Sequence, residues 1–258
     1  MTATPMTIDV AAPQIAGVKA LVMAGGRAAR MRKSSGAAHK ALTPVLGISL
    51  LERNLRMLLR QGLPAITIAV SAREPALADA CREIGGRCAE ASGARVDIFI
   101  EEQPLGTIGA ARAAGTDCAA LLVVNVDNLT TLNLRRFIGW HRDQMAAMTI
   151  ATHWEPFTIP YGEVVVQGDA VTAYLEKPAR PIRISSGTYV LSPEACGHIA
   201  PDRAVNVPDL FDLLTRRGAT VSAFVHHAPW IDVNDAFDVS RAERLVREHA
   251  AEFGGTGQ

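Results

Sequence analysis

The chain has 258 residues, of which 48% are apolar and 20% are charged. Its 26 basic side chains are matched by 26 acidic ones, so the formal net charge at pH 7 is zero. This balance argues against a protein that coats nucleic acid or binds anionic membranes, because both classes usually carry a basic excess. The length allows one large α/β domain, or a domain with a modest accessory part, and the composition predicts a well-packed core.

The four cysteines form no CxxC pair and no Cys/His metal spacing, so they are expected to be buried free thiols. No apolar run approaches the roughly 20 residues that a membrane span requires. The N-terminus lacks the basic and apolar regions of a signal peptide. We therefore expect a cytoplasmic protein with no membrane partner, a flexible leader over residues 1–16 and a flexible tail over 251–258.

Short apolar runs alternate with helical patterns in the first part of the chain. Buried strands are predicted at 18–24, 65–71, 96–102 and 120–127, and helices at 49–62, around 75–88 and at 106–115. The helix at 49–62 has a clear start, because Ser49 and Glu52 form a capping box. This βαβ rhythm predicts a Rossmann-like, mostly parallel twisted sheet with helices on both faces.

The pattern changes after about residue 145. Strands with short turns are predicted in "MTIATHW", "YGEVVVQGDAVTAYLEKP", "SGTYVLS" and "TVSAFVHHAPWIDV", with an antiparallel hairpin turn at Gln167–Gly168–Asp169. A last helix is predicted from about 235 to 249. We expect a single domain over 17–250, with a mostly parallel half at about 17–145 and a more antiparallel half at about 146–245.

The first predicted strand leads directly into a loop of small and basic residues. Gly25 and Gly26 are followed by Arg27, Arg30, Arg32, Lys33 and Lys40. Glycines after a strand let backbone N–H groups approach a phosphate. The loop matches neither the P-loop pattern nor G-x-G-x-x-G. On its own, the segment is equally typical of a tight turn followed by a solvated basic loop.

Six segments, in order over about residues 18–243, resemble the sugar-1-phosphate nucleotidyltransferases, and in particular the mannose/heptose-1-phosphate guanylyltransferase branch. The loop resembles G-G-x-G-T-R-L-x-P-L-T-x-x-x-P-K, "PLGTIGAARAA" resembles L-G-T-A-G-A, and "VVNVDNLT" resembles a strand that ends in N-G-D. "YGEVVV" with "VTAYLEKP" resembles Y-G-x-V and F-x-E-K-P, "SSGTYVL" resembles N-A-G-x-Y-x-L, and "WIDVNDAFDVSRAE" resembles W-x-D-I-G-T-P.

The resemblance implies a nucleotide-binding half at about 17–145 and a sugar-phosphate-binding half at about 146–245, and it implies roles for individual residues. Catalytic roles fall on Arg30, Lys40 and Lys177; nucleotide binding on Ala24, Gly25, Gly26, Gly106, Thr107, Gly109 and Asn125; sugar-phosphate binding on Gly162, Glu176, Lys177, Ser185 and Gly187; and metal binding on Asp127 and Asp232. Transfer of a nucleotide to an anionic sugar phosphate needs no general base, but it needs Mg²⁺ and fixed cations around the phosphates.

The resemblance is weakest in the phosphate loop. The usual Gly-Thr before the arginine is Ala28–Ala29, and the usual Pro before the lysine is His39. Three interpretations follow. The protein is an active nucleotidyltransferase with an altered loop, a related protein that binds without catalysis, or a relative of the cytidylyl- and molybdopterin-nucleotide transferases. The segment "AGGRAARM" also resembles the loop of this last group. The E-K-P and W-x-D segments favour the first.

The resemblance also implies the substrates. The L-G-T-x-G segment is closer to the guanylyl-transferring branch than to the thymidylyl branch, so GTP is the expected nucleoside triphosphate and a sugar 1-phosphate the second substrate. Homo-oligomers are common in the family, so the resemblance also allows a homo-oligomer, although the sequence does not define the oligomeric state.

Overall fold

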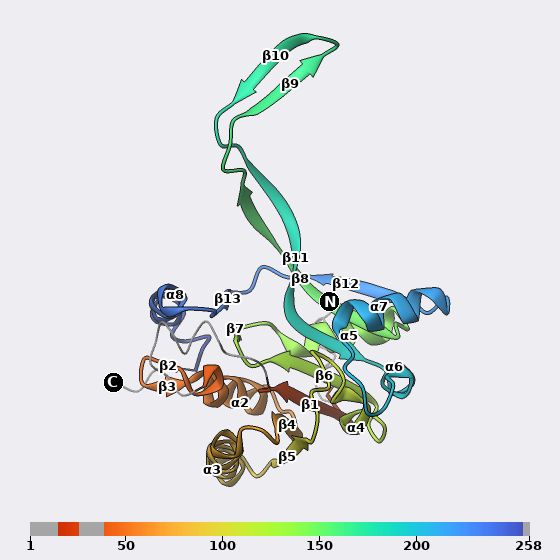
Figure 1. The fold of residues 1–258 in the computed structure, drawn as a ribbon. Coiled ribbons are helices and arrows are strands. Elements are labelled where there is room, and N and C mark those ends of the chain that lie inside the picture. Colours follow the sequence, from red (N-terminus) through yellow and green to blue (C-terminus); the bar gives the residue numbers. More distant parts are fainter. Residues whose placement is uncertain (1–14, 26–38, 255–258) are drawn as a thin grey trace, which may run out of the picture.

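A mixed seven-stranded sheet lies at the centre of the protein (Figure 1). The structure is a computed structural model, and it describes residues 15–25 and 39–254. The strand order is β12-β8-β11-β6-β1-β4-β5. These strands are β1 (Val18–Met23), β4 (Ala65–Ser71), β5 (Arg95–Glu101), β6 (Ala120–Asn125), β8 (Met148–Thr158), β11 (Ala179–Leu191) and β12 (Val221–Val225).

The pairing in this sheet confirms the predicted mostly parallel α/β architecture. β1 pairs in parallel with β4 and β6, and β4 pairs in parallel with β5. β11 enters as the antiparallel strand between β6 and β8, and β12 closes the edge in parallel with β8. Strands from both predicted halves therefore share one sheet.

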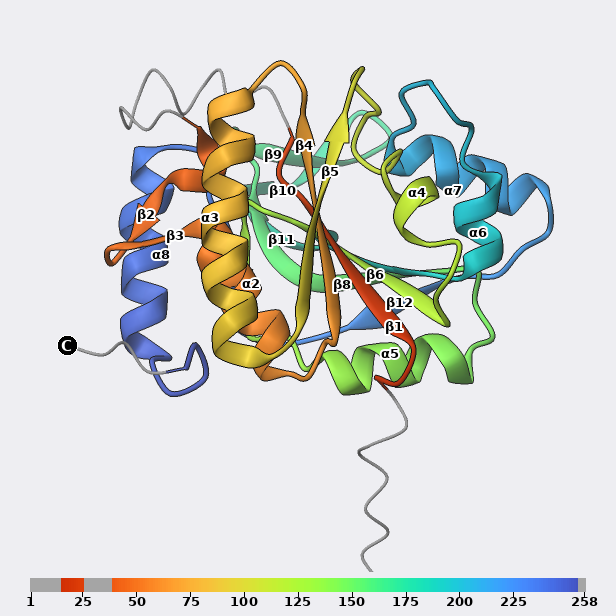
Figure 2. The same ribbon diagram turned by 90° about the horizontal axis from the view of Figure 1, so that it is seen from below.

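Helices cover both faces of the sheet (Figure 2). Alternate residues of β1 point to opposite faces, so Ala20 and Val22 lie in one core cluster and Leu21 and Met23 in the other. The first face packs against α2 (Leu50–Arg60), α3 (Pro75–Ser92) and α5 (Leu134–Asp143); the second packs against α4 (Ala111–Ala114), α6 (Pro193–His198) and α7 (Val207–Arg216).

A third, smaller core cluster lies beside the carboxyl ends of the central strands. It joins β2 (Pro44–Val45), α2, β7 (Asn128–Thr130), β13 (Trp230–Asp232) and α8 (Ala236–Glu248), with Leu50, Leu129 and Val246 buried at its centre. The short helix η1 (Lys40–Leu42) and strand β3 (Ile48–Ser49) complete this region. None of the described helices is long and apolar enough to cross a membrane.

Three predicted elements differ from the structure. The helix predicted at 106–115 is reduced to α4, because Gly106 has a φ of +81° and its Cα lies against the Val205 carbonyl, which leaves a turn in place of the first helical residues. The strand predicted over "TVSAFVHHAPWIDV" splits into β12 and β13 around Pro229, which has no N–H for a ladder. The strand predicted at "SGTYVLS" is much longer, since β11 begins at Ala179.

The extra length of β11 belongs to a projecting arm, which we define as residues 154–183. Here β8 and β11 continue as a two-stranded ribbon beyond the sheet, pairing from Trp154↔Arg183 out to Thr158↔Ala179. The predicted hairpin, β9 (Glu163–Gln167) and β10 (Ala170–Leu175), forms a separate two-stranded sheet at the far end (Figure 1). The hairpin turn is confirmed: Gly168 has a φ of +59°.

Candidate functional site

Three charged residues that are far apart in sequence meet at the carboxyl end of β6. Lys40 is the first residue of η1, Asp127 lies two residues after the end of β6, and Asp232 is the last residue of β13. The Nζ atom of Lys40 lies 2.7 Å from Asp127 Oδ2 and 3.9 Å from Asp232 Oδ1. The pairing of β13 with β7 places Asp232 opposite Asn128, and so beside Asp127. The structure therefore brings together one predicted catalytic residue and both predicted metal ligands.

Two asparagines that the sequence reasoning missed hold this cluster in place. Asn234 accepts from Lys40 Nζ at 2.7 Å and donates to Asp232 Oδ2 at 2.7 Å. Asn128 donates from Nδ2 to Asp127 Oδ1 at 3.0 Å. Each asparagine follows a predicted acid by one or two residues, so proximity in sequence was the available signal.

The electrostatics of the cluster suit a bound cation. Burial, followed by the nearby Asp127 carboxylate, raises the pKa of Asp232. The Oδ1 atom of Asp232 and the Oδ1 atom of Asn128 are buried and accept no hydrogen bond. Two carboxylates close together, with a buried acceptor oxygen left unsatisfied, favour an additional positive charge at this point.

The donor set fits a magnesium ion with few protein ligands. Over the part of the chain that the structure describes, no group of three or more His, Cys, Asp or Glu side chains gathers as a metal site. Mg²⁺ commonly takes one or two carboxylates and keeps water or substrate phosphate oxygens as its other ligands. Asp127 and Asp232 supply two carboxylates, and the Lys40 ammonium balances their charge in this structure.

A bulge in β11 places two predicted sugar-phosphate residues beside the same cluster. The register of β11 against β8 shifts between Ser185 and Tyr189. Gly187 has a φ of +67°, and a Cβ there would lie 2.3 Å from Asn128 Nδ2 and 3.1 Å from the amide nitrogen of the predicted nucleotide-binding residue Asn125. Ser185 donates to the Tyr189 hydroxyl at 3.1 Å. The bulge therefore packs directly on the residues that flank Asp127.

The start of the predicted phosphate loop lies at the end of β1. The backbone N–H groups of Ala24 and Gly25 both donate to the Ala69 carbonyl at 3.0 Å. Gly26 and Arg30 lie outside the described residues. Beside Gly25 stands Glu101, an acid that the sequence reasoning did not single out: a Cβ on Gly25 would be 3.5 Å from its Oε2 atom. Burial raises the pKa of Glu101, and its Oε1 atom has no hydrogen-bond partner.

The predicted nucleotide-binding glycines of the "PLGT" segment have structural contacts of their own. A Cβ at Gly106 would lie 2.5 Å from the Val205 carbonyl oxygen, and one at Gly109 would lie 2.1 Å from the Leu105 carbonyl oxygen. The Thr107 hydroxyl accepts from the N–H of Val207 at 3.1 Å. This segment is thus fixed against the start of α7, and its role in nucleotide binding stays a prediction.

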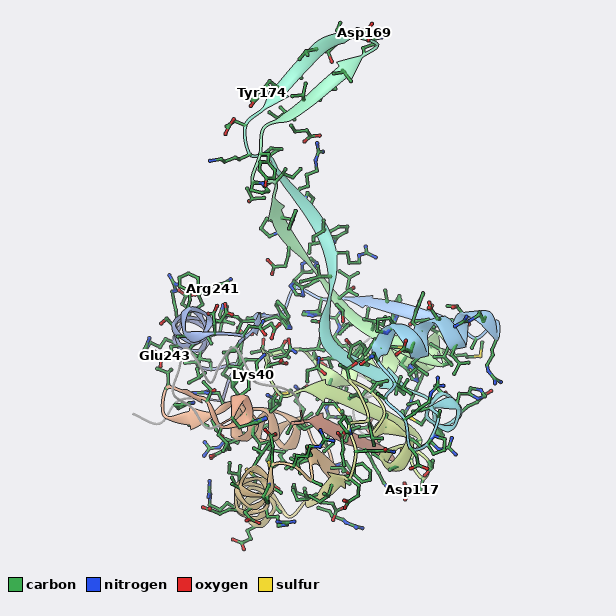
Figure 3. The ribbon with its side chains drawn as sticks, in the orientation of Figure 1. Lys40, Asp117, Asp169, Tyr174, Arg241 and Glu243 are labelled. Carbon is green, nitrogen blue, oxygen red and sulfur yellow. The ribbon has the colours of Figure 1, made fainter. Side chains whose placement is uncertain are left out.

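The arm carries the remaining predicted residues away from the cluster. Gly162 and Glu176–Lys177 flank the β9–β10 hairpin, and Figure 3 shows Tyr174 at the outer part of the arm while Lys40 lies in the body. Lys177 has a φ of +45°, a left-handed conformation that is uncommon outside glycine and concentrates at functional sites. The structure does not bring Glu176 or Lys177 of this chain to Asp127.

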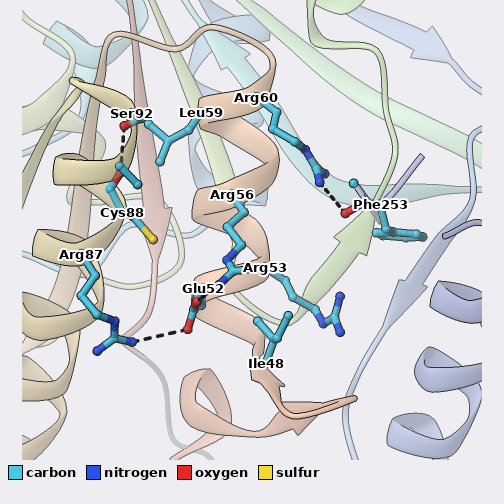
Figure 4. A pocket seen from close by; sticks show the side chains of 12 residues that line it. Ile48, Glu52, Arg53, Arg56, Leu59, Arg60, Arg87, Cys88, Ser92 and Phe253 are labelled. Carbon is cyan, nitrogen blue, oxygen red and sulfur yellow. Dashed lines mark hydrogen bonds and ion pairs between the residues drawn. The ribbon is translucent and has the colours of Figure 1, made fainter. Parts of the chain in front are cut away.

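A cavity of about 660 Å³ lies between α2 and α3, apart from this cluster (Figure 4). Its lining includes Arg53, Arg56, Arg60 and Arg87, with Glu52 paired to Arg56 and Arg87. Figure 4 shows Arg60 directed at Phe253, whose carbonyl oxygen accepts its hydrogen bond, so this part of the predicted flexible tail packs against α2. A lining with four arginines repels a metal ion, which leaves the Asp127–Asp232 pair as the better cation site.

Comparisons with known proteins agree with this geometry. The family model described as "Nucleotidyl transferase" matches residues 19–248. Mannose-1-phosphate guanylyltransferase of Mycobacterium tuberculosis is 30% identical over 240 residues, which cover 89% of this chain and 65% of the relative. The bifunctional protein GlmU of an Exiguobacterium species is 29% identical over 90% of this chain and 53% of its own length. The chain thus spans between about half and two thirds of these curated relatives.

A solved structure shows the same fold. HddC from Yersinia pseudotuberculosis, crystallised in complex with GMP-PN, has a TM-score of 0.67 and 26% identity, covering 88% of this chain and 98% of that one. The ordered motifs, the mixed sheet and a family model that spans nearly all of the sequence lead to one conclusion. The chain belongs to the nucleotidyl transferase family.

Proposed function

We propose that the protein is a sugar-1-phosphate nucleotidyltransferase, which joins a nucleoside triphosphate and a sugar 1-phosphate to give an NDP-sugar and pyrophosphate. The observation that carries this proposal is the convergence of Lys40, Asp127 and Asp232 at the carboxyl ends of the strands. Ligands of open α/β sheets bind at this edge. A relative named mannose-1-phosphate guanylyltransferase supports the same reaction.

The reaction needs positioning and charge neutralisation more than proton transfer. A phosphate oxygen of the sugar 1-phosphate forms a bond to the α-phosphorus of the triphosphate, the bond from that phosphorus to the bridging oxygen breaks, and pyrophosphate leaves with the electron pair. Lys40 lies where its ammonium can stabilise the phosphates, and Arg30, which precedes it in the loop, is proposed for the same task. Ser185 and Gly187 are proposed to border the sugar.

Asp127 and Asp232 are the residues proposed to hold Mg²⁺. When bound, the metal would neutralise charge on the phosphates. The Lys40 ammonium lies beside both carboxylates, 2.7 Å from Asp127 Oδ2 and 3.9 Å from Asp232 Oδ1. It offsets part of their negative charge, and it is proposed to contact the phosphates of the substrates.

The nucleotide we propose is GTP, with mannose 1-phosphate or a heptose 1-phosphate as the acceptor. Two observations support guanine: a relative named mannose-1-phosphate guanylyltransferase and a structural neighbour in complex with GMP-PN. The "PLGT" segment beside Glu101 favours the same branch.

The test is release of pyrophosphate with Mg²⁺, measured for GTP, UTP, CTP, dTTP and ATP against mannose, glucose and heptose 1-phosphates. We expect release with GTP and one of the sugars, and none from Asp127→Ala. Asp79→Ala is the matched control, because Asp79 is an exposed residue of α3 that pairs only with Arg82 among the interactions described. Silence of the wild-type protein across the panel, with GTP binding retained in calorimetry, would support a non-catalytic binding protein instead.

A further inference from the structure

Most of the exposed large hydrophobic side chains of the described chain lie on the arm. No residue from Trp154 to Ser185 is buried. Of the fifteen large hydrophobic side chains that are exposed in the described chain, ten lie on the arm: Trp154, Phe157, Tyr161, Val164, Val165, Val166, Val171, Tyr174, Leu175 and Ile182. A contiguous apolar surface of this kind marks an interaction site in a protein that is otherwise well packed.

The pattern of the hairpin indicates that it is covered on both faces. In β9 the three consecutive residues Val164, Val165 and Val166 are 47%, 41% and 60% exposed. Successive strand residues point to opposite faces, so both faces of the hairpin are apolar. An isolated two-stranded ribbon is marginally stable in water. The arm therefore needs a second surface to pack against.

The same arm carries residues that the catalytic cluster lacks. Glu176 and Lys177 match the family's sugar-phosphate motif, yet they follow β10 on the arm. By the rise of a β-strand, they stand roughly 20 Å along the ribbon from the sheet edge. The backbone N–H of Ile159 donates to the Pro178 carbonyl at 3.0 Å, which continues the ribbon pairing next to Lys177 and holds it there.

We propose that two copies of the chain exchange arms, so that the arm of each copy packs on its partner and supplies Glu176 and Lys177 to the partner's Lys40–Asp127–Asp232 site. This inference rests on the proposed function for the role of Lys177. A second copy of the chain accounts for both observations. Its site lacks Glu176 and Lys177, and its own arm has an exposed apolar surface that must be covered. A two-fold axis lets both arms be covered and both sites be completed at once.

The backbone at Lys177 fits this arrangement. Its left-handed conformation, with a φ of +45°, costs free energy in a residue that has a Cβ. Gly162 lies across the base of the hairpin, where a Cβ would be 2.1 Å from the Tyr174 hydroxyl. The ion pair between Arg180 and Glu163 joins the two sides of the arm near the same point. These contacts fix the base of the hairpin beside Lys177, whose side chain is exposed.

Complementation between two inactive variants tests the exchange. Asp127→Ala and Lys177→Ala chains are co-expressed with different affinity tags, and the doubly tagged dimer is purified. Each variant alone should be inactive. The mixed dimer should recover about half of the wild-type activity, because one of its two sites combines an intact Asp127 with an intact arm from the other chain. A mixed dimer as inactive as its parents would show that the arm serves its own chain.

A readout without activity separates this inference from the proposed function. Lys177→Cys/Asn234→Cys chains are treated with a short bis-maleimide, with the two single variants as controls for the native cysteines. Arm exchange predicts a covalent dimer in denaturing gels and a wild-type dimer by light scattering, whether or not the protein turns over GTP. A wild-type monomer, or a crosslink confined to single chains, would overturn the exchange. Val166→Glu on the arm should give a folded monomer. The melting temperature of this variant checks that the rest of the protein is folded.

Discussion

Gly187 lies so close to Asn128 that a Cβ at this position would stand 2.3 Å from the asparagine's amide nitrogen. Asn128 donates in turn to Asp127, so the bulge in β11 and the proposed metal ligand are separated by one side chain. Gly187 also has a left-handed backbone, with a φ of +67°. Glycine is required here for two independent reasons.

We therefore expect Gly187→Ala to lower the free energy of unfolding by about 1–3 kcal/mol and to reduce turnover, because Asn128 must shift. Thermal unfolding and pyrophosphate release measure the two effects. Gly197→Ala in α6 is the matched control, since a Cβ there meets no atom within 4 Å and its backbone is helical. Equal activity in both variants would contradict the role of the bulge.

Lys40→Met should separate charge balance from catalysis. Loss of the ammonium should lower kcat/KM by roughly 10²- to 10³-fold, as for removal of one group that stabilises a transition state. The concentration of Mg²⁺ needed for half-maximal activity should not rise, because the competing cation between Asp127 and Asp232 is gone. A higher Mg²⁺ requirement would contradict this arrangement.

The control for that variant is Lys19→Met. Lys19 forms an exposed ion pair with Asp117, which Figure 3 shows well away from Lys40. The activity of this control should stay near that of the wild type.

The sequence predicted the parts of the site that depend on local patterns. Asp127 follows an apolar run that reads as a buried strand, so its place at the sheet edge could be inferred from the strand alone. Asp232 and Lys40 needed the family resemblance, because no local pattern says that β13 pairs with β7. Their meeting within 4 Å is a property of the tertiary structure.

Other features gave no local signal. The tertiary structure places Glu101 beside Gly25, and the reach of the arm depends on how far β8 and β11 extend beyond the neighbouring strands. Three residues, Gln167–Gly168–Asp169, were enough to predict the hairpin turn. No such local pattern predicted that Lys177 lies away from the cluster of its own chain.

Two buried histidines predict a loss of stability at mildly acidic pH. Burial lowers the pKa of His141 to about 4 and that of His226 to about 4. Between the ordinary value near 6.5 and the folded value, the unfolded chain binds more protons, so stability rises with pH in this window. Their contribution is complete above about pH 6.5 and is lost as the pH falls toward 4, by at most about 3 kcal/mol for each histidine.

Urea unfolding between pH 4.5 and 7.5 measures this dependence. His226→Gln should flatten the profile, because the neutral imidazole that contacts Ser186 Oγ at 2.9 Å is replaced by a group that does not titrate. His227→Gln provides the comparison, since the adjacent histidine is exposed. Equal slopes in the two variants would exclude His226 as a source of the pH dependence.

Asn54 connects helix α2 to the catalytic edge. Its buried amide donates to the Leu50 carbonyl and to the Val126 carbonyl, each at 3.0 Å, and Val126 directly precedes Asp127. Asn54→Leu would leave the Val126 carbonyl without this donor. We expect a loss of about 1–3 kcal/mol in the free energy of unfolding. We also expect a fall in kcat at saturating Mg²⁺ with little change in KM, because Asp127 would be less well positioned.

Gln61 offers a matched comparison on the same helix. Its amide donates to the Leu132 carbonyl at 2.9 Å and accepts from the N–H of Leu134 at 2.8 Å, so it fixes the loop beyond β7 in the same manner. Gln61→Leu should cost similar stability while leaving kcat near the wild-type value. If the fall in kcat tracked the loss of stability in the same way in both variants, Asn54 would contribute only to the stability of the fold. A kcat effect confined to Asn54→Leu would identify it as a positioning residue for Asp127.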